Sequence, residues 1–281
     1  MNIRSHFTYR KAVDRIVRGL CLLAALLALV PLFSVLYYVT ARGLGGISFE
    51  FFTELPTPVG EEHGGVANAI TGTLTLVGLA CLFGIPPGVL AGVYLSQFGH
   101  TRLGKIVRFS ADVMSGVPSV TIGIFVYSLL VVRTKQFSAY AGGLALAVIM
   151  LPTVTRTTEE LLKLVPEALR EAALGLGVPQ WRTTLSVMLR TAAPGVATGI
   201  MLAVARVAGE TAPLLFTSFS NRFWPGGLDE PTASLPVQIY TYAVSPYEDW
   251  HSQAWAAALV LVALVLTLNV AARVLVRHRV R

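Results

Sequence analysis

Apolar residues are concentrated in six runs along the chain, and each run is bounded by charged or turn-forming residues. An α-helix needs about 20 apolar residues to cross the hydrocarbon core of a membrane, and most of the runs reach that length. The fourth run is the shortest and could begin nearer Phe137. The pattern predicts an all-α integral membrane protein with six transmembrane helices, over Leu20–Val39, Ile70–Leu95, Val113–Val132, Gly142–Thr157, Gly195–Phe219 and Ala254–Val276.

The composition also favours a lipid environment. Hydrophobic residues make up 54% of the 281 residues and charged residues only 13%, whereas a soluble domain carries about a quarter charged residues. The net charge of +7 is spread between the apolar runs and forms no patch, so we expect no nucleic-acid partner. Cys21 and Cys81 lie inside apolar runs, which indicates small packing residues and argues against a disulfide or a metal site.

The basic residues are divided unequally between the two sides of the membrane that six crossings create. Seventeen Lys and Arg residues fall on the side of the N-terminus and four on the other side. Because positive residues favour the cytoplasm, this bias predicts that both termini are cytoplasmic. The run Leu20–Val39 is too long for a typical signal peptide and no convincing cleavage site follows it, so we expect a retained first helix.

Two long segments, Ala41–Gly65 and Ser220–Gln253, are then predicted to lie outside the cell. Both are rich in glycine and proline, and they carry aromatic residues such as Trp224, Tyr240 and Trp250. Segments of this length usually have a function or lack fixed structure. Docking of an external partner and anchoring of Trp and Tyr at the membrane interface both fit this composition.

The cytoplasmic segment 158–190 contains three helix-start signals. Thr157 and Glu160 have the spacing of a capping box, which predicts a helix that begins there. Pro166 ends that helix and can open another at its first turn, and Pro179 starts a third short helix.

The middle helix of this segment is predicted over Glu167–Leu176, with Gly177 as its C-terminal stop. Its apolar residues recur at helical spacing, so the helix is amphipathic. On composition alone it lies on the lipid headgroups. Its small residues would equally allow another protein to approach it closely.

The run Glu171-Ala172-Ala173, followed after three residues by Gly177, resembles the EAA signature of ABC importer permeases. In that family this segment is the coupling helix, which seats in a groove of the ATPase subunit. The tail of the signature matches less well, because Arg190 stands where proline is usual and the next proline is Pro194. The resemblance implies that the residues that couple this chain to an ATPase are Glu167, Glu171, Ala172, Ala173 and Gly177.

Further motifs narrow the resemblance to the phosphate permeases of this family. They are the sequences SGVPS at 115–119, RVAGETAP at 206–213 and SLPVQIY at 234–240. The last of them, together with SPYEDW at 245–250, is similar to PstA-type subunits more than to their PstC-type partners. The likeness covers most of the chain from about Val66 onward.

This resemblance implies a type I ABC importer (MetI-like) permease fold in a bacterial inner membrane. Residues 1–65 would form a cytoplasmic N-terminus, an accessory first helix and an external loop, and residues 66–277 the transmembrane core with its coupling loop at 158–190. The implied partners are a homologous PstC-type permease, two cytoplasmic ATPase subunits and an external phosphate-binding protein. ATP and Mg²⁺ would be used by the partner ATPase, and no cofactor is expected on this chain.

The fifth run contains Arg206 and Glu210, which are four residues apart and therefore share one helix face. Such charges face a cavity or a partner helix, because placing one in hydrocarbon costs on the order of a few kcal/mol. The pair could simply neutralise itself and hold the bundle together. Alternatively, Arg206 contacts phosphate during passage and Glu210 holds it when the path is empty. Family membership implies this second placement, with Thr211 in the path and with Gly209 and Pro213 loosening the helix.

The segment Gly99–Lys105 imitates the front of a nucleotide-binding P-loop, but Ile106 replaces the Ser or Thr that would bind magnesium. We therefore expect a basic cytoplasmic loop, no enzyme active site, and ATP chemistry on another chain. Three rival interpretations are a secondary transporter that uses Arg206 and Glu210 as a relay, an ABC permease for molybdate or sulfate, and a structural scaffold. The EAA-like segment argues against the first of these.

Overall fold

The computed structural model describes residues 3–58 and 64–279, and every regular element within these two ranges is helical. A 3₁₀ turn covers Leu44–Gly46, and wider π-helical turns cover Tyr127–Val131 and Thr183–Met188. The predicted all-α fold class is therefore confirmed. The α-helices are α1 (Ile3–Gly43), α2 (Phe49–Thr53), α3 (Ala67–Phe98), α4 (Arg102–Gly116), α5 (Ser119–Val126), α6 (Val132–Thr134), α7 (Ala139–Lys163), α8 (Glu167–Gly175), α9 (Gln180–Arg182), α10 (Leu189–Ala208), α11 (Ala212–Thr217), α12 (Leu235–Ala243) and α13 (Glu248–Arg279).

Five helices in the described residues are long and apolar enough to cross a membrane, and a bent pair supplies a sixth if it is one span. Four of the six predicted runs each lie wholly within one helix, and these helices are α1, α3, α7 and α13. The predicted number of six crossings is reached when the bent pair, α4 with α5 and α6, counts as one crossing.

The third predicted helix, Val113–Val132, is wrong as a single element. Helix α4 ends at Gly116, α5 begins at Ser119, and the two parts of the pair are bent by 106°. Val117 has extended backbone (φ −74°, ψ 129°), as residues before proline usually do. Pro118 cannot donate a backbone hydrogen bond and serves as the N-cap of α5, so the chain turns at this dipeptide.

The fifth predicted helix, Gly195–Phe219, is likewise broken, at Gly209–Thr211. The N–H groups of the first two residues of this break donate to carbonyls three residues earlier, at 3.2 Å each, so the last turn of α10 tightens before the chain leaves the helix. Pro213 then lies in the first turn of α11, where its missing N–H group is not needed. Hydropathy alone could not reveal the break, although the loosening effect of Gly209 and Pro213 was foreseen.

Other segments belong to longer helices than the sequence predicted. The segment Gly99–Lys105 was expected to be a basic loop, but its second part, from Arg102 on, forms the first turn of α4. Thr157 and Glu160 do not start a helix, because α7 continues through them to Lys163. The helix that begins after Pro179 is also not short, since it runs through a π-helical turn into α10 as one span. In these places tertiary packing decides the outcome over local start signals.

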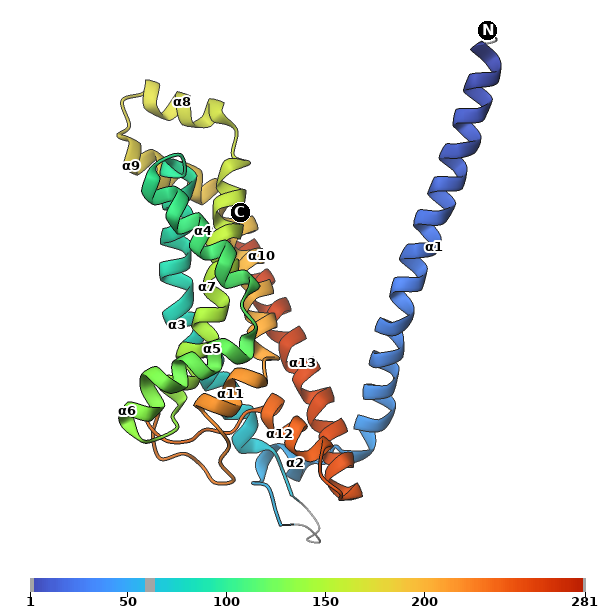
Figure 1. Cartoon of the computed structure of the whole chain (residues 1–281), viewed down its shortest axis with the longest axis vertical. Coiled ribbons are helices and arrows are strands. Elements are labelled where there is room, and N and C mark those ends of the chain that lie inside the picture. The colour runs from blue at the N-terminus through green and yellow to red at the C-terminus, as the bar shows by residue number, and fades with distance from the viewer. Residues whose placement is uncertain (1–2, 59–63, 280–281) are drawn as a thin grey trace.

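Close packing of α3 on α7 forms the centre of the bundle (Figure 1). Glycines at positions 84, 88 and 92 recur every fourth residue along the face of α3 that meets α7. A Cβ atom on Gly88 would lie 2.9 Å from the Val154 Cβ, and one on Gly92 would lie 2.5 Å from the Thr158 Cβ. Small residues at this spacing let two membrane helices approach closely, as in other small-residue helix contacts.

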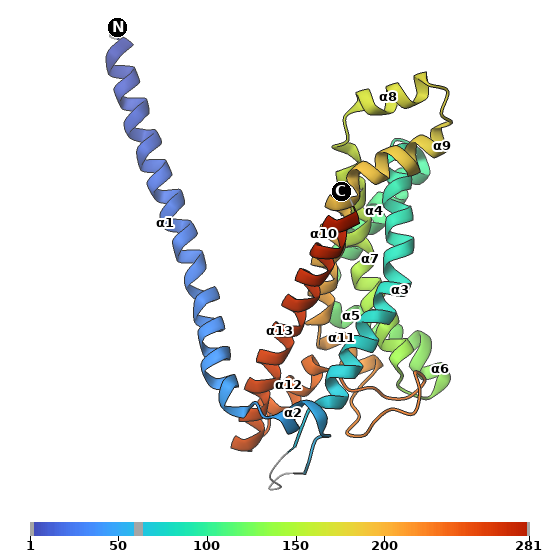
Figure 2. The same ribbon diagram turned by 180° about the vertical axis from the view of Figure 1, so that it is seen from behind.

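Helix α1 diverges from the other helices, as both views show (Figures 1 and 2). It meets α13 only near its C-terminal end, where a Cβ atom on Gly43 would lie 2.9 Å from the Leu259 Cβ. The start of α1 lies at the same end of the molecule as α8, and α2 and α12 lie at the opposite end (Figure 1). These two ends are called the α8 end and the α12 end below.

Candidate translocation site and coupling helix

Helix α8 projects beyond the bundle at the α8 end, between two short connections (Figure 1). Pro166 is its N-cap residue, with φ −56° and ψ 131°. Glu167 lies in the first turn, where a negative charge interacts favourably with the helix dipole. Its carboxylate accepts a hydrogen bond from Arg170 at 3.2 Å. The predicted helix Glu167–Leu176 is therefore confirmed, ending one residue earlier.

Gly177 ends α8 in the predicted way. Its φ of +81° lies in the left-handed region that favours glycine. The Val178 N–H donates to the Ala173 carbonyl at 3.1 Å, and the Gly177 N–H donates to the Leu174 carbonyl at 2.9 Å. This pair of bonds is a Schellman motif, which satisfies the last carbonyls of the helix and fixes the direction in which the chain leaves it.

The EAA-like residues are split between the two faces of α8. Ala173 is buried and packs toward the π-helical turn Thr183–Met188 that leads into α10. Glu171 and Ala172 are exposed. Leu176, at the tip, is 85% exposed. One face of α8 is thus fixed to the bundle, and the other presents an acidic and apolar surface that suits contact with another protein.

The predicted charged pair lies where α10 ends. Arg206 is in the last turn of α10, and Glu210 lies just beyond its end. The Arg206 Nε and the Glu210 Oε1 are 3.9 Å apart, so the two side chains meet even though the helix does not continue to Glu210. The Arg206 side chain is 58% exposed and the Glu210 side chain 18%. Thr211 follows as the N-cap residue of α11.

A second helix break lies close to this pair, and the sequence analysis missed it. Gly123 of α5 packs on Pro213 of α11, where a Cβ atom would lie 2.6 Å from the Pro213 Cα. The half-helix after the break at Val117–Pro118 therefore contacts the half-helix after the break at Gly209–Thr211. Broken helices at membrane depth occur where the backbone is buried in protein or lines a cavity. Pro118, inside the third apolar run, was the sequence signal that could have revealed this break.

A cluster of charged side chains joins α4 to α7, and the sequence did not reveal it. Glu159 is completely buried and accepts hydrogen bonds from Arg108, at 3.1 Å from its Nε, from Arg156 at 2.9 Å, and from Lys163. Arg156 also pairs with Asp112 at 3.1 Å. These five residues are called the Glu159 cluster below. Such a carboxylate is saturated with cations, which offsets the cost of burying its charge.

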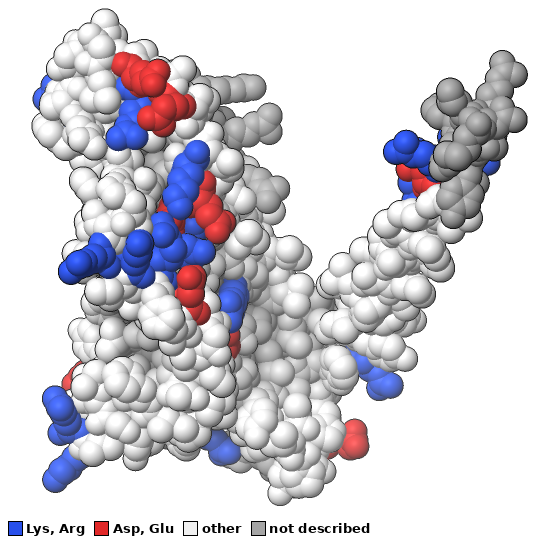
Figure 3. All heavy atoms as spheres, turned by 45° about the horizontal axis from the view of Figure 1, so that its top comes forward, with Lys and Arg blue, Asp and Glu red and all other residues white. Residues whose placement is uncertain are grey.

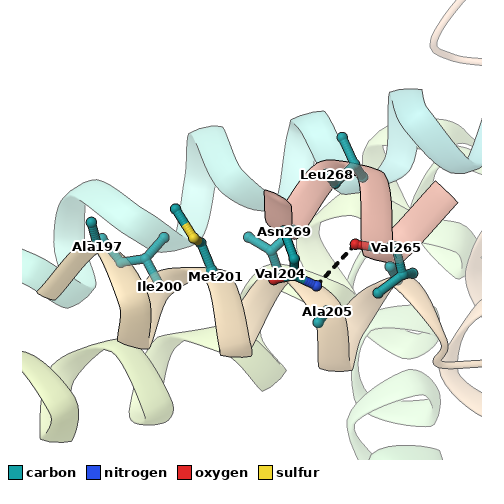
Figure 4. A pocket seen from close by; sticks show the side chains of 9 residues that line it. Ala197, Ile200, Met201, Val204, Ala205, Val265, Leu268 and Asn269 are labelled. Atoms are coloured by element: carbon teal, nitrogen blue, oxygen red, sulfur yellow. Dashed lines mark hydrogen bonds between the residues drawn. The ribbon is translucent and has the colours of Figure 1, made fainter. Parts of the chain in front are cut away.

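A groove of about 310 Å³ lies between α10 and α13 (Figure 4). Its lining residues, such as Met201, Val204 and Leu268, are almost all apolar. The amide of Asn269 is turned to the Val265 carbonyl, to which it donates at 2.9 Å. An anion would find no compensating charge in this groove, so we place the candidate translocation site at Arg206 and not here.

Comparison with known proteins defines the class. Residues 84–281 match the family described as "Binding-protein-dependent transport system inner membrane component". The chain therefore belongs to this family of importer permeases, and it is an integral protein of the inner membrane. Solved structures support the fold. The alginate ABC transporter matches with a TM-score of 0.68 over 96% of both chains at 16% identity, and the MetNI methionine ABC transporter with 0.60 over 77% of this chain and 94% of that chain at 20% identity.

Curated relatives place the chain within the family. "Phosphate transport system permease protein PstA" of Haemophilus influenzae is 43% identical over 99% of each chain. The protein of the same name from Yersinia pestis is 43% identical over 97% of this chain and 92% of its own. PstA 1 of Mycobacterium tuberculosis is 40% identical over 87% of this chain. The chain is thus a PstA-type permease, as its motifs predicted.

Proposed function

We propose that this chain is one half of the membrane path of an ATP-driven importer for inorganic phosphate. The observation that carries the proposal is Arg206, a largely exposed arginine that stands at a helix break inside a PstA-type permease. The name of the curated relatives supports phosphate as the substrate.

The chemistry of Arg206 suits an oxyanion. Its guanidinium is permanently charged and presents a planar fork of donors that matches phosphate oxygens. At 3.9 Å, its contact with Glu210 is longer than a normal hydrogen bond, so phosphate can replace Glu210 without breaking a strong interaction. When phosphate leaves, Glu210 neutralises the arginine again and keeps the path from holding the anion too tightly. Thr211 adds a hydroxyl beside the pair.

The source of energy is proposed to be a partner ATPase that docks on α8. Glu171 and Ala172 are exposed on the outer face of this helix, and Glu167 opens it. At its far end Gly177 and a short connection lead directly into the span Gln180–Ala208, which carries Arg206 in its last turn. A displacement of α8 therefore acts on the helix that carries the site, with few flexible residues between them. ATP and Mg²⁺ would be bound by the partner, and this chain only receives the motion.

The remaining partners follow from the same proposal. The α8 end would face the cytoplasm together with both termini, as the distribution of basic residues predicts. A PstC-type permease would complete the path, since the Arg206 side chain is largely exposed and a second permease would have to enclose it. An external phosphate-binding protein would dock at the α12 end, where Trp250 stacks on Tyr242 with ring centroids 4.6 Å apart.

The test is uptake of labelled phosphate into vesicles that contain the assembled complex, with binding protein outside and ATP inside. Uptake is expected with ATP, not without it, and excess sulfate or molybdate should not compete. The variant Glu171→Arg should lose uptake and ATPase docking together. Uptake that runs without ATP would instead identify a secondary transporter. Full competition by sulfate or molybdate would identify a permease for another oxyanion.

A further inference from the structure

The charged side chains of α4 and α7 have no role in the function proposed so far. Figure 3 shows blue and red side chains gathered in a band that begins at α8 and continues over the upper part of the bundle, while most of the surrounding surface is white. The Lys and Arg residues in this part of the chain include Arg108, Arg156 and Lys163 of the Glu159 cluster, although the sequence indicated that basic residues form no patch. The band therefore requires a separate explanation.

Most of the cluster is explained by structure alone. Glu159 is 0% exposed and binds three cations, so it ties α4 to α7. Arg108 additionally donates to the Gly99 carbonyl at 3.2 Å, which fixes the turn before α4. Among the described residues, Glu159 is the sole ion-pair partner of Arg108 and of Lys163, so a ligand could bind either cation only by displacing a carboxylate that water does not reach.

Arg156 differs from these two cations. All three cations are partly exposed and bind Glu159, but among the described residues Arg156 alone has a second carboxylate partner. This partner is Asp112, which is 51% exposed and lies 3.1 Å from the Arg156 Nε. An exposed ion pair is weak, so Asp112 can be replaced by another anion at little cost. Three cations face two carboxylates in the cluster, which leaves one net positive charge on this part of the surface.

The position of Arg156 follows from the packing of α7 on α10, which run in opposite directions. Gly195 packs on Leu161 and Gly199 packs on Thr157, next to Arg156. Arg206 is seven residues farther along α10 than Gly199. At a rise of about 1.5 Å per residue, the level of Arg156 is about 10 Å from that of Arg206, toward the α8 end.

We propose that Arg156 is a second phosphate-contacting residue, which receives the anion after Arg206 on its way to the cytoplasm. This inference rests on the proposed function, since it needs phosphate to pass Arg206. Each arginine pairs with a carboxylate that has no other ion-pair partner among the described residues, Glu210 for Arg206 and Asp112 for Arg156, although Arg156 also keeps its bond to Glu159. Anion transfer through a membrane requires sites that bind and also release, and two weak sites in series meet that requirement better than one strong site.

The test is the initial rate of labelled phosphate uptake in vesicles that hold the whole complex, with ATP hydrolysis measured in the same vesicles. Loss of one charge-assisted hydrogen bond corresponds to a fall of about tenfold or more, so Arg156→Gln should reduce uptake by that factor. Arg156→Lys should retain most of the rate. Arg18→Gln is a matched control, because Arg18 also pairs with an aspartate, Asp14 at 2.8 Å, but on exposed α1. It should leave uptake unchanged.

The double variant Arg156→Gln with Asp112→Asn separates contact with phosphate from a purely structural role. It removes both charges of the exposed pair and leaves Glu159 with Arg108 and Lys163. If Arg156 contacts phosphate, the double variant stays as slow as Arg156→Gln. Recovery to within about twofold of the wild-type rate would show that Arg156 only neutralises its neighbours, and would overturn the proposal.

A third variant covers the case in which Arg156→Gln does not assemble. Asp112→Asn keeps Arg156 and removes its competitor, so phosphate should be held longer and the maximal uptake rate should fall about threefold or more. A wild-type rate in Asp112→Asn would contradict the relay. Failure of the proposed function has a different signature, because the wild-type complex itself would then import no phosphate with ATP.

Discussion

Two sets of ion pairs in this molecule use the same kinds of residue with opposite results. In the Glu159 cluster a fully buried carboxylate is bound by three cations, two of them from its own helix and one from α4. At the break after α10, Arg206 is mostly exposed, and Glu210, at 3.9 Å, is its one ion-pair partner among the residues that the structure describes. The Glu159 carboxylate thus has its hydrogen-bonding capacity filled by cations, whereas Arg206 keeps donors that no carboxylate occupies.

The difference teaches how one chain can use charge inside a membrane for two purposes. The bonds to the buried Glu159 stabilise the fold, because its carboxylate cannot be removed without leaving three cations unpaired. An unsaturated pair at a helix break leaves donors free for a passing anion. The comparison assigns a structural role to the buried Glu159 and a transport role to Arg206, and each assignment can be tested separately.

The largest expected effect is on stability, at Glu159. The change Glu159→Ala leaves Arg108, Arg156 and Lys163 without their shared carboxylate, and breaking a buried pair in this way costs about 3–5 kcal/mol. The thermal midpoint of the purified complex should therefore fall strongly. An unchanged midpoint would show that the cluster is not structural and would remove the contrast with Arg206.

The next effect concerns Glu210, which the comparison treats as a displaceable partner. The change Glu210→Gln removes its charge, so Arg206 should hold phosphate longer and the maximal uptake rate should fall by about tenfold, the equivalent of one charged hydrogen bond. The thermal midpoint should stay near that of the wild type. A large loss of stability with normal uptake per assembled complex would mean that this pair is also structural.

A smaller effect is expected at the connection between α8 and the site. Gly177 has φ +81°, so Gly177→Ala should cost about 1 kcal/mol locally and loosen the exit of α8. Fewer phosphate ions should be imported for each ATP hydrolysed. Gly175→Ala is the matched control, because a Cβ atom there meets nothing within 4 Å. Equal behaviour of the two variants would count against α8 as a rigid connection.

The smallest effect is expected at an ion pair that is neither buried nor placed at the site. Asp14 and Arg18 on α1 are 2.8 Å apart, but both are well exposed. The change Asp14→Asn should alter stability by about 0.5 kcal/mol or less and leave uptake unchanged. A larger change in stability or in uptake would indicate that the importance of an ion pair follows from the distance between its charges. The comparison instead attributes that importance to burial and to the position of the pair.

Much of the fold could be predicted from the sequence because local rules decide it. The spans α1, α3, α7 and α13 follow from apolar length, and α8 follows from Pro166 before it and Gly177 after it. The motif around Glu171 and the three phosphate-permease motifs also identified the family correctly.

The parts that could not be predicted depend on contacts between distant segments. Hydropathy registers how apolar a run is, but not that Pro118 turns it through 106°. The Glu159 cluster requires Arg108, 51 residues earlier in the chain, to lie beside α7. No periodicity within one segment encodes that neighbour, so basic residues of α4 were assigned to a loop.

The most direct test of the account is the ratio of phosphate imported to ATP hydrolysed, measured in the same vesicles for wild type, Arg206→Lys and Arg206→Ala. The account predicts that Arg206→Ala still assembles and hydrolyses ATP when the binding protein is present. Its uptake should be lower by about tenfold or more, with Arg206→Lys between it and the wild type. Normal uptake in both variants would contradict the assignment of Arg206 to the path.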